Sequence, residues 1–154
     1  MSTETLWRVQ TAIYTLLTQS SAVTTLLAQA GAVYDHVPAG SAFPYIVLGD
    51  MTAQTSDTQQ HSGAEIFCTL ESHSRQTGQQ EIKKIASAIH AALHHQSPAI
   101  SGHVTVLCEM TDTQSEYLPD TTLRTQMDIG PAKTRQRTTA GIGQLSLGFL
   151  LTAG

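Results

Sequence analysis

Residues 33–50 constrain the fold of this chain more than any other segment. They read V-Y-D-H-V-P-A-G-S-A-F-P-Y-I-V-L-G-D. The valine and tyrosine residues at the start favour a strand, and Pro38 and Gly40 then indicate a turn. Pro44 opens a second apolar strand, where its missing N–H costs no ladder hydrogen bond, and Gly49 ends it. The block holds no nucleophile, metal cluster or phosphate-binding loop, so it predicts architecture rather than chemistry.

The flanking segments separate into helical and strand periodicities. Apolar residues recur at helical spacing in residues 6–17 and again in residues 82–93, where Thr77 and Gln80 form a possible capping box. A shorter helix is predicted over residues 22–28. Alternation with a period of two predicts further strands over residues 65–72, 103–110 and 145–151, and residues 121–129 are another strand candidate. This order of elements predicts an α+β class, with a largely antiparallel β-sheet and helices packed on one face.

Length and charge limit the possible classes of protein. At 154 residues, a single domain over residues 1–154 is expected. Charged residues make up 13% of the chain, against about 25% in average soluble domains. A surface poor in charge suits permanent contacts between subunits. Residues 1–120 carry a net charge of −7, whereas residues 121–154 carry +3. We find neither a membrane-spanning run nor a signal peptide.

Few residue patterns in the sequence support a catalytic or a metal-binding site. His90 and His94 are four residues apart on a helix, as in some zinc sites, but they lack the glutamate of H-E-x-x-H and further ligands. Cys68 and Cys108 lie in strand-like runs and are expected to be free, buried thiols. We therefore expect no catalytic residue, cofactor or metal. The alternative classes are a small metal-dependent enzyme using the histidine face, and a binding module that has borrowed the fold.

Two polar segments lack core patterning and are candidates for contacts with other subunits. Residues 51–63 are interpreted as a long hairpin loop or arm, and residues 130–140 as a basic arm with alternating cations. The hypothesis is that these segments contact neighbours through Gln54, Asp57, Gln59, His61, Lys133, Arg135 and Arg137.

The V-Y-D-H-V-P and P-Y-I-V-L-G-D motifs within the 33–50 block resemble a family of phage tail-completion proteins. These proteins, also called tail terminators, occur in long-tailed phages and related gene-transfer particles. The resemblance covers about residues 6–110. The later motif D-I-G-P-A-K-T-R-Q-R-T-T-A is similar to one in another group of phage tail-associated proteins. Residues 1–110 are thus predicted to be a family-like core, and residues 111–154 a divergent C-terminal β extension with a basic arm.

This resemblance implies a structural virion protein and not an enzyme. Such proteins cap the head-proximal end of the tail tube as a ring, commonly a hexamer, which stops tube polymerisation and forms the head–tail joining interface. The implied partners are further copies of the chain, the major tail tube protein and a head connector or stopper. DNA is expected to pass through the lumen without sequence-specific binding, and no membrane is involved. The implied location is the virion tail or neck, after assembly in the host cytoplasm. The alternative in the same setting is a head-side connector ring, either adaptor or stopper.

Only architectural positions are carried over from the family. The residues that match its motif, and that are expected to shape the sheet and its turns, are Tyr34, Pro38, Pro44, Tyr45, Gly49 and Asp50.

Overall fold

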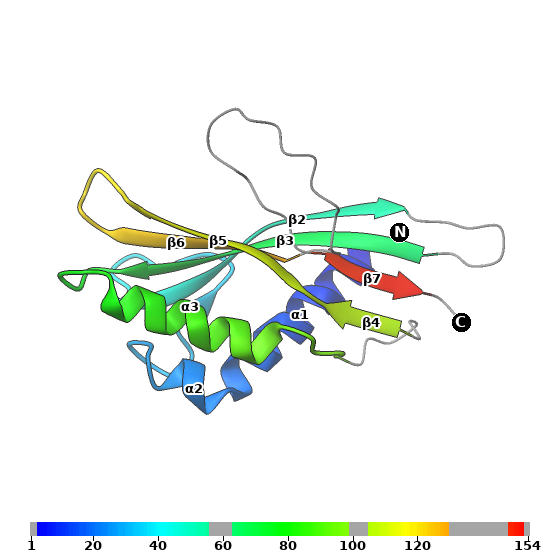
Figure 1. Ribbon diagram of the computed structural model, residues 1–154, viewed down its shortest axis with the longest axis horizontal. Coiled ribbons are helices and arrows are strands. Elements are labelled where there is room, and N and C mark those ends of the chain that lie inside the picture. Colours follow the sequence, from blue (N-terminus) through cyan, green and yellow to red (C-terminus); the bar gives the residue numbers. More distant parts are fainter. Residues whose placement is uncertain (1–2, 56–62, 99–104, 130–147, 153–154) are drawn as a thin grey trace.

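The computed structural model describes residues 3–55, 63–98, 105–129 and 148–152 (Figure 1). Its helices and strands are, in chain order, α1 (Thr3–Gln19), α2 (Ser21–Thr24), β1 (Val33–Tyr34), β2 (Tyr45–Thr55), β3 (Gly63–Ser74), α3 (Gln80–Leu93), β4 (Thr105–Cys108), β5 (Met110–Tyr117), β6 (Leu123–Ile129) and β7 (Gly148–Thr152). None of the described helices combines the length and the apolar character needed to cross a membrane.

The described strands form one sheet arranged around β3. One side of β3 pairs with β2 in antiparallel fashion, and β2 pairs in parallel with the short strand β1. The other side of β3 pairs with two strands in succession: β6 along Cys68–Ser74 and β7 along Gly63–Phe67. Beyond these, β5 pairs with β6 and β4 pairs with β7. Among the described residues, β1 is therefore one edge of the sheet, and β4 and β5 form the opposite edge.

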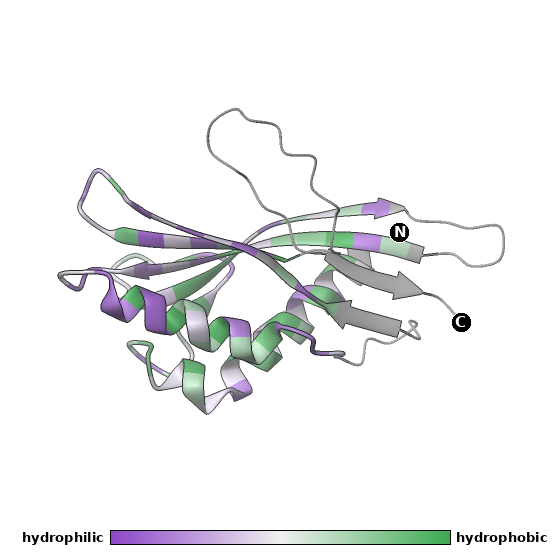
Figure 2. Cartoon of the chain, viewed as in Figure 1, coloured by the Kyte–Doolittle hydropathy of each residue, from purple (hydrophilic) through white to green (hydrophobic). Residues whose placement is uncertain are grey.

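The helices lie on one face of this sheet (Figure 1). Helix α3 shows alternating bands of hydrophobic and hydrophilic residues in Figure 2, and its buried stripe is the one that its periodicity predicts. It packs over β3 and β6, whereas α1 packs beside β1 and β2. The buried side chains of β3 alternate as expected, with Ile66, Cys68 and Leu70 in the core. The predicted α+β class, with a largely antiparallel sheet, is confirmed.

Gly49 does not end the second strand, contrary to the prediction. Strand β2 begins at Tyr45, after a cis peptide bond between Phe43 and Pro44, and it continues to Thr55 with a break in register between Leu48 and Met51. The first part of the segment predicted as a polar loop is therefore strand. Its threonines favour a strand. The segment lacks alternating apolar residues, and pairing with β3 stabilises it instead.

Three other features also differ from the prediction. The capping box does not form, because the N-cap of α3 is Gln79 and its side chain caps no backbone N–H. Helix α2 ends at Thr24 rather than at residue 28. The alternating run at 103–110 is divided at Glu109 between β4 and β5, and β5 extends to Tyr117. The backbone N–H of Met110 there donates to His94 Nδ1 at 3.2 Å, so the end of α3 is bonded to this break.

Strands β6 and β7 occupy one continuous line beside β3, although 18 residues separate them in the sequence. Ile129, the last residue of β6, is opposite Cys68, and Gly148, the first residue of β7, is opposite Phe67. Ile129 and Gly148, the described residues on either side of residues 130–147, are therefore opposite adjacent residues of β3. Below we call residues 130–147 the basic segment, because they contain three cationic residues and no acidic ones.

Candidate interaction surfaces

The matched positions of the 33–50 block surround an aromatic cluster at the end of the sheet. The Tyr45 ring lies 6.0 Å from the Tyr34 ring in an edge-on arrangement, and it stacks on His73 at 5.1 Å between centroids. Burial raises the pKa of Tyr45, while the charge of Arg75 opposes this rise. Phe43 packs against Tyr45 at 4.8 Å and carries the Arg75 guanidinium 4.2 Å above its ring.

The remaining positions of the motif shape the backbone around this cluster. The carbonyl of Pro44 accepts a hydrogen bond from Ala28 N–H at 3.0 Å, and that of Pro38 accepts one from Ser41 N–H at 3.2 Å. Gly49 lies against β3, where an added Cβ would be 2.9 Å from the Thr69 carbonyl oxygen. Asp50 is exposed beside it. That all these positions serve architecture remains a prediction.

Of the residues predicted to contact other subunits, only Gln54 lies within the described part of the chain. It is exposed on β2, opposite Glu65 of β3. The other predicted contact residues lie outside the described residues, and they are Asp57, Gln59, His61, Lys133, Arg135 and Arg137.

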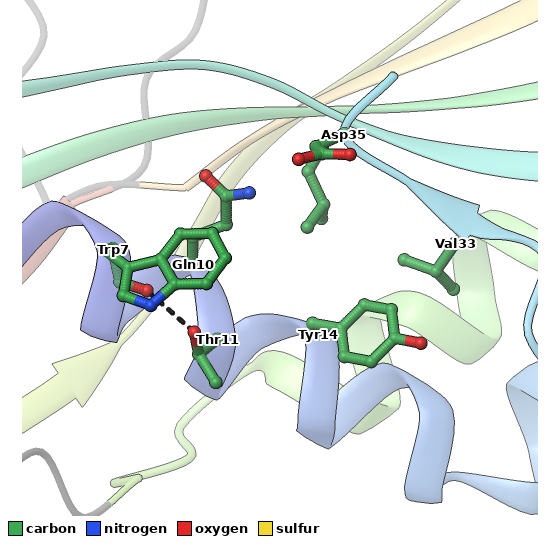
Figure 3. Close-up of a pocket in the computed structure, with 7 residues that line it drawn as sticks. Trp7, Gln10, Thr11, Tyr14, Val33 and Asp35 are labelled. Carbon is green, nitrogen blue, oxygen red and sulfur yellow. Dashed lines mark hydrogen bonds between the residues drawn. The ribbon is translucent and has the colours of Figure 1, made fainter. Parts of the chain in front are cut away.

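A groove of about 310 Å³ lies between α1 and the β1 edge of the sheet (Figure 3). We call it the α1 groove, and the residues that line it are Trp7, Gln10, Thr11, Tyr14, Val33, Asp35 and Leu48. In Figure 3, Trp7 and Tyr14 project from α1, while Val33 and Asp35 face them from the β1 side. The Thr11 hydroxyl donates to the Trp7 carbonyl at 2.9 Å. This groove was not predicted from the sequence, although Trp7, Thr11 and Tyr14 follow one helical stripe separate from the core stripe.

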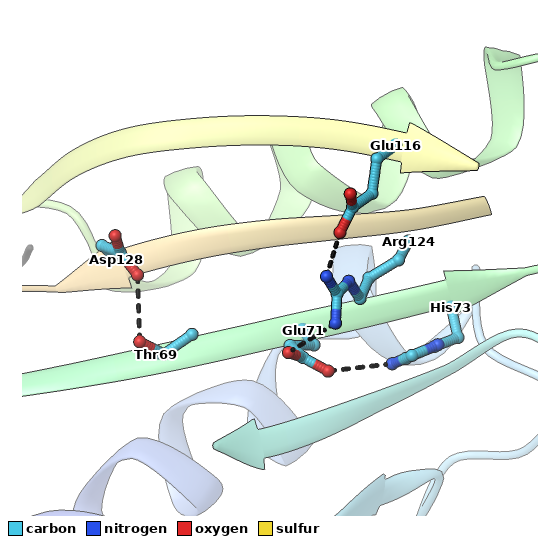
Figure 4. A network of polar contacts seen from close by, with 6 residues as sticks. All are labelled: Thr69, Glu71, His73, Glu116, Arg124 and Asp128. Carbon is cyan, nitrogen blue, oxygen red and sulfur yellow. Dashed lines mark hydrogen bonds and ion pairs between the residues drawn. The ribbon is translucent and has the colours of Figure 1, made fainter. Parts of the chain in front are cut away.

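The sheet face opposite the helices carries a polar network that crosses three strands (Figure 4). Arg124 of β6 contacts Glu71 of β3 at 3.4 Å and also pairs with Glu116 of β5. A hydrogen bond from His73 is the main reason why the pKa of Glu71 is lowered, and the charge of Arg124 adds to this effect. The Thr69 hydroxyl donates to the buried carboxylate of Asp128 at 3.0 Å. We call this surface the outer sheet face.

Three histidine rings stack where α3 ends. The ring centroids of His90 and His94 are 4.4 Å apart, and those of His94 and His95 are 3.9 Å apart. Partial burial lowers the pKa of His94, and the charges of His95 and His90 lower it further, while Glu109 opposes this effect. Within the described ranges, no three histidine, cysteine, aspartate or glutamate side chains come together as ligands for a metal ion.

Both cysteines are free and buried, as predicted. Burial raises the pKa of the Cys68 thiol to about 12 and also raises that of Cys108. A thiol with a raised pKa holds little thiolate near neutral pH, so neither residue has the character of a reactive nucleophile. The described surfaces offer a groove, open sheet edges and a polar face, which are features suited to binding other macromolecules.

Comparisons with known proteins found a matching family and a solved structure with a similar fold. Residues 11–129 match the protein family described as Tail completion protein gp17. Among solved structures, a chain from the virion of a native gene transfer agent particle superposes with a TM-score of 0.75 at 19% sequence identity. This superposition covers 99% of the present chain and 100% of the other chain, and it establishes a shared fold. No curated protein sequence matches the chain.

Proposed function

Because this chain belongs to the Tail completion protein gp17 family and is thus a structural protein of a phage-type tail, we propose that it caps the head-proximal end of the tail tube. In this proposal, copies of the chain form a ring, which we expect to contain six subunits. The ring stops tube polymerisation and presents the surface to which the filled head is joined. The partners are the major tail tube protein on one side and a head connector or stopper on the other.

The observation that carries the proposal is the match to the tail-completion family over residues 11–129. The chain in the gene transfer agent virion supports it, because that chain has the same fold over its whole length. The sheet supports it as well. A ring built from identical subunits needs two different patches on each subunit, and β1 and β5 provide open edges on opposite sides of the described sheet.

The charge of the outer sheet face suits a lumen through which DNA passes. Glu65, Asp112 and Glu116 lie on strands of this face and reach solvent, and residues 1–120 are acidic overall. Phosphate groups are held by cationic side chains, so an acidic lining would leave DNA free to move without sequence-specific binding. We infer that this face is turned toward the DNA.

The β2–β3 hairpin and the basic segment are the proposed contacts with neighbouring proteins. Thr55 pairs with Ala64, so residues 56–63 can be replaced by Asn-Gly, a two-residue sequence suited to a tight hairpin. This change removes Asp57, Gln59 and His61 while it leaves the β2–β3 pairs up to Thr55 and Ala64 in place. Cells that lack the native protein would be supplied with this variant or with the wild type, and tail length and head attachment would be scored by electron microscopy.

The shortened variant is expected to fold but to give tails without heads. A matched control, His36→Ser, alters an exposed turn residue outside the hairpin and should give normal particles. Normal head attachment with the shortened hairpin would exclude the hairpin as a contact. If the wild-type protein binds a portal-bound connector complex but not the tail tube protein, the chain is instead a head-side connector.

A further inference from the structure

The α1 groove leaves large aromatic surfaces exposed to solvent. Trp7 is 62% exposed and Tyr14 is 41% exposed, and together with Tyr117 they are the exposed large hydrophobic residues of the described chain. Both are on α1 and both line the same groove. We propose that this groove receives the basic segment, residues 130–147, of a second copy of the chain. This inference rests on the proposed ring, and it assigns the contact that would join one subunit to the next.

Charge complementarity supports this occupant. Asp35 lines the groove and is exposed, and its carboxylate accepts a hydrogen bond from the backbone N–H of His36 at 2.8 Å. No cation of the described residues forms an ion pair with it. The basic segment contributes Lys133, Arg135 and Arg137 and carries no acid. A carboxylate beside the faces of a tryptophan and a tyrosine is a suitable site for lysine and arginine, because these cations are attracted both to the carboxylate and to aromatic faces.

The spacing of the cations suits an extended occupant. Lys133, Arg135 and Arg137 alternate with Thr134 and Gln136, so an extended backbone would place the three cations on one side. The groove lies along the edge strand β1, beside which an extended segment can be accommodated. The cations would then face Asp35 and the two aromatic rings.

The path that the segment would have to take, rather than its length, favours a second copy over the chain itself. The residues that flank its 18 residues are opposite neighbouring positions of β3, so a loop of this length could extend about 30 Å from the sheet. The groove is at the β1 edge, and β2 separates this edge from β3. To reach its own groove, the segment would have to pass around β2 and β1, whereas a neighbouring subunit can present its groove directly.

Cysteine cross-linking between two kinds of subunit tests this proposal. One full-length variant carries Thr11→Cys in the groove, and the other carries Thr134→Cys in the basic segment. The two are mixed and treated with a short bis-maleimide, and interchain products are measured by gel electrophoresis and mass spectrometry. The native thiols are buried, so the wild-type protein provides the blank. Ser87→Cys, which is exposed on α3, replaces Thr11→Cys in the control mixture.

The proposal predicts an 11–134 product in the mixture and little product with the Ser87→Cys control. Adding Asp35→Lys to the groove variant should lower the yield about tenfold, since like charges would then meet. Replacing the three cations of the segment by glutamate in the partner should restore it. Equal yields from both mixtures would overturn the proposal, as would a sample that forms no 11–134 product.

The remaining outcomes identify other occupants. If a subunit that carries both cysteines, diluted in excess wild type, cross-links only within itself, the segment lies in its own groove and the proposal is wrong. Trp7 is the only tryptophan of the chain, so its fluorescence reports on the groove independently. Its emission should shift to shorter wavelength as wild-type subunits associate, and it should not shift in the Lys133→Ser/Arg135→Ser/Arg137→Ser variant. Tails of normal length made by a protein that fails both tests would overturn this contact and leave the capping function intact.

Discussion

Among Gly31, Gly40, Gly49 and Gly78, Gly49 is the one at which an added Cβ would meet a neighbouring atom within 4 Å. It lies at the break in the register of β2, and a Cβ there would approach the carbonyl oxygen of Thr69 to 2.9 Å. Because that oxygen belongs to the backbone of the central strand β3, it cannot rotate away as the end of a flexible side chain could. The glycine of the family motif thus permits the close approach of two strands.

Gly49→Ala should therefore lower the free energy of unfolding by about 1–3 kcal/mol, as overpacking does in a core. Urea denaturation followed by circular dichroism would measure it. Gly31→Ala is the matched control, because nothing lies within 4 Å of its added Cβ, and it should change stability by less than about 0.5 kcal/mol. Equal effects at the two positions would show that the contact with Thr69 does not limit residue 49.

His94 should make stability depend on pH. Its Nδ1 accepts a hydrogen bond from Met110 N–H, and its pKa is lowered below the ordinary value of 6.5. The unfolded chain therefore takes up a proton at this residue more readily than the folded chain does. The stabilising contribution is complete above pH 6.5 and is lost as pH falls below that value.

Thermal unfolding measured between about pH 5 and pH 8, a range on both sides of the ordinary histidine pKa, would test this prediction. His94→Gln should flatten the profile below pH 6.5, whereas His36→Gln, in an exposed turn, should leave it unchanged. A wild-type profile with no slope in this interval would contradict the assignment.

At the scale of the elements, Arg124 joins three strands of the outer sheet face. It contacts Glu71 on β3 and Glu116 on β5 from its position on β6. Its side chain is 29% exposed and that of Glu71 is 25% exposed, so solvent screens this pair only in part. The network therefore adds to the backbone pairing that holds β5 at the edge of the sheet.

Arg124→Met should lower the free energy of unfolding by about 1 kcal/mol, since both carboxylates lose a cationic partner while the apolar part of the side chain remains. Lys84→Met, on the exposed surface of α3, is the control and should have almost no effect. If the two variants are equally stable, the network does not contribute to the stability of the sheet.

The elements with a strong local pattern could be predicted from sequence, whereas those determined by pairing could not. The apolar stripe of α3 and the alternation of β3 are encoded within single segments. The strand character of residues 51–55 depends instead on pairing with β3. The continuation of β6 by β7 also depends on contacts far apart in sequence, which no local period records.

The described surfaces differ in how clearly the sequence signals them. The family motif identified the residues around Tyr45, because its prolines and aromatics are distinctive in sequence. The α1 groove was missed because Trp7 and Tyr14 resemble additional core positions until the partner strand β1 is known to leave them exposed. Asp35 joins them only through the folding of the 33–50 block.

The whole molecule divides its charge between an acidic body and a basic segment. Residues 1–120 carry −7 and residues 121–154 carry +3. If the basic segment of one copy binds the acidic groove of the next, added salt should weaken association between subunits, because exposed charges are screened. Analytical ultracentrifugation across salt concentrations should show this dependence in the wild type and a smaller one in the Lys133→Ser/Arg135→Ser/Arg137→Ser variant. Association that strengthens with salt would instead indicate a mainly apolar contact.

The central claim is that copies of this chain close the end of a tail tube. The most direct test adds the purified protein to tail tube protein during polymerisation and images the products by electron microscopy. We predict shorter tubes, each with a ring-shaped density of rotational symmetry at one end. Tubes of unchanged length, with no added density at either end, would contradict the account.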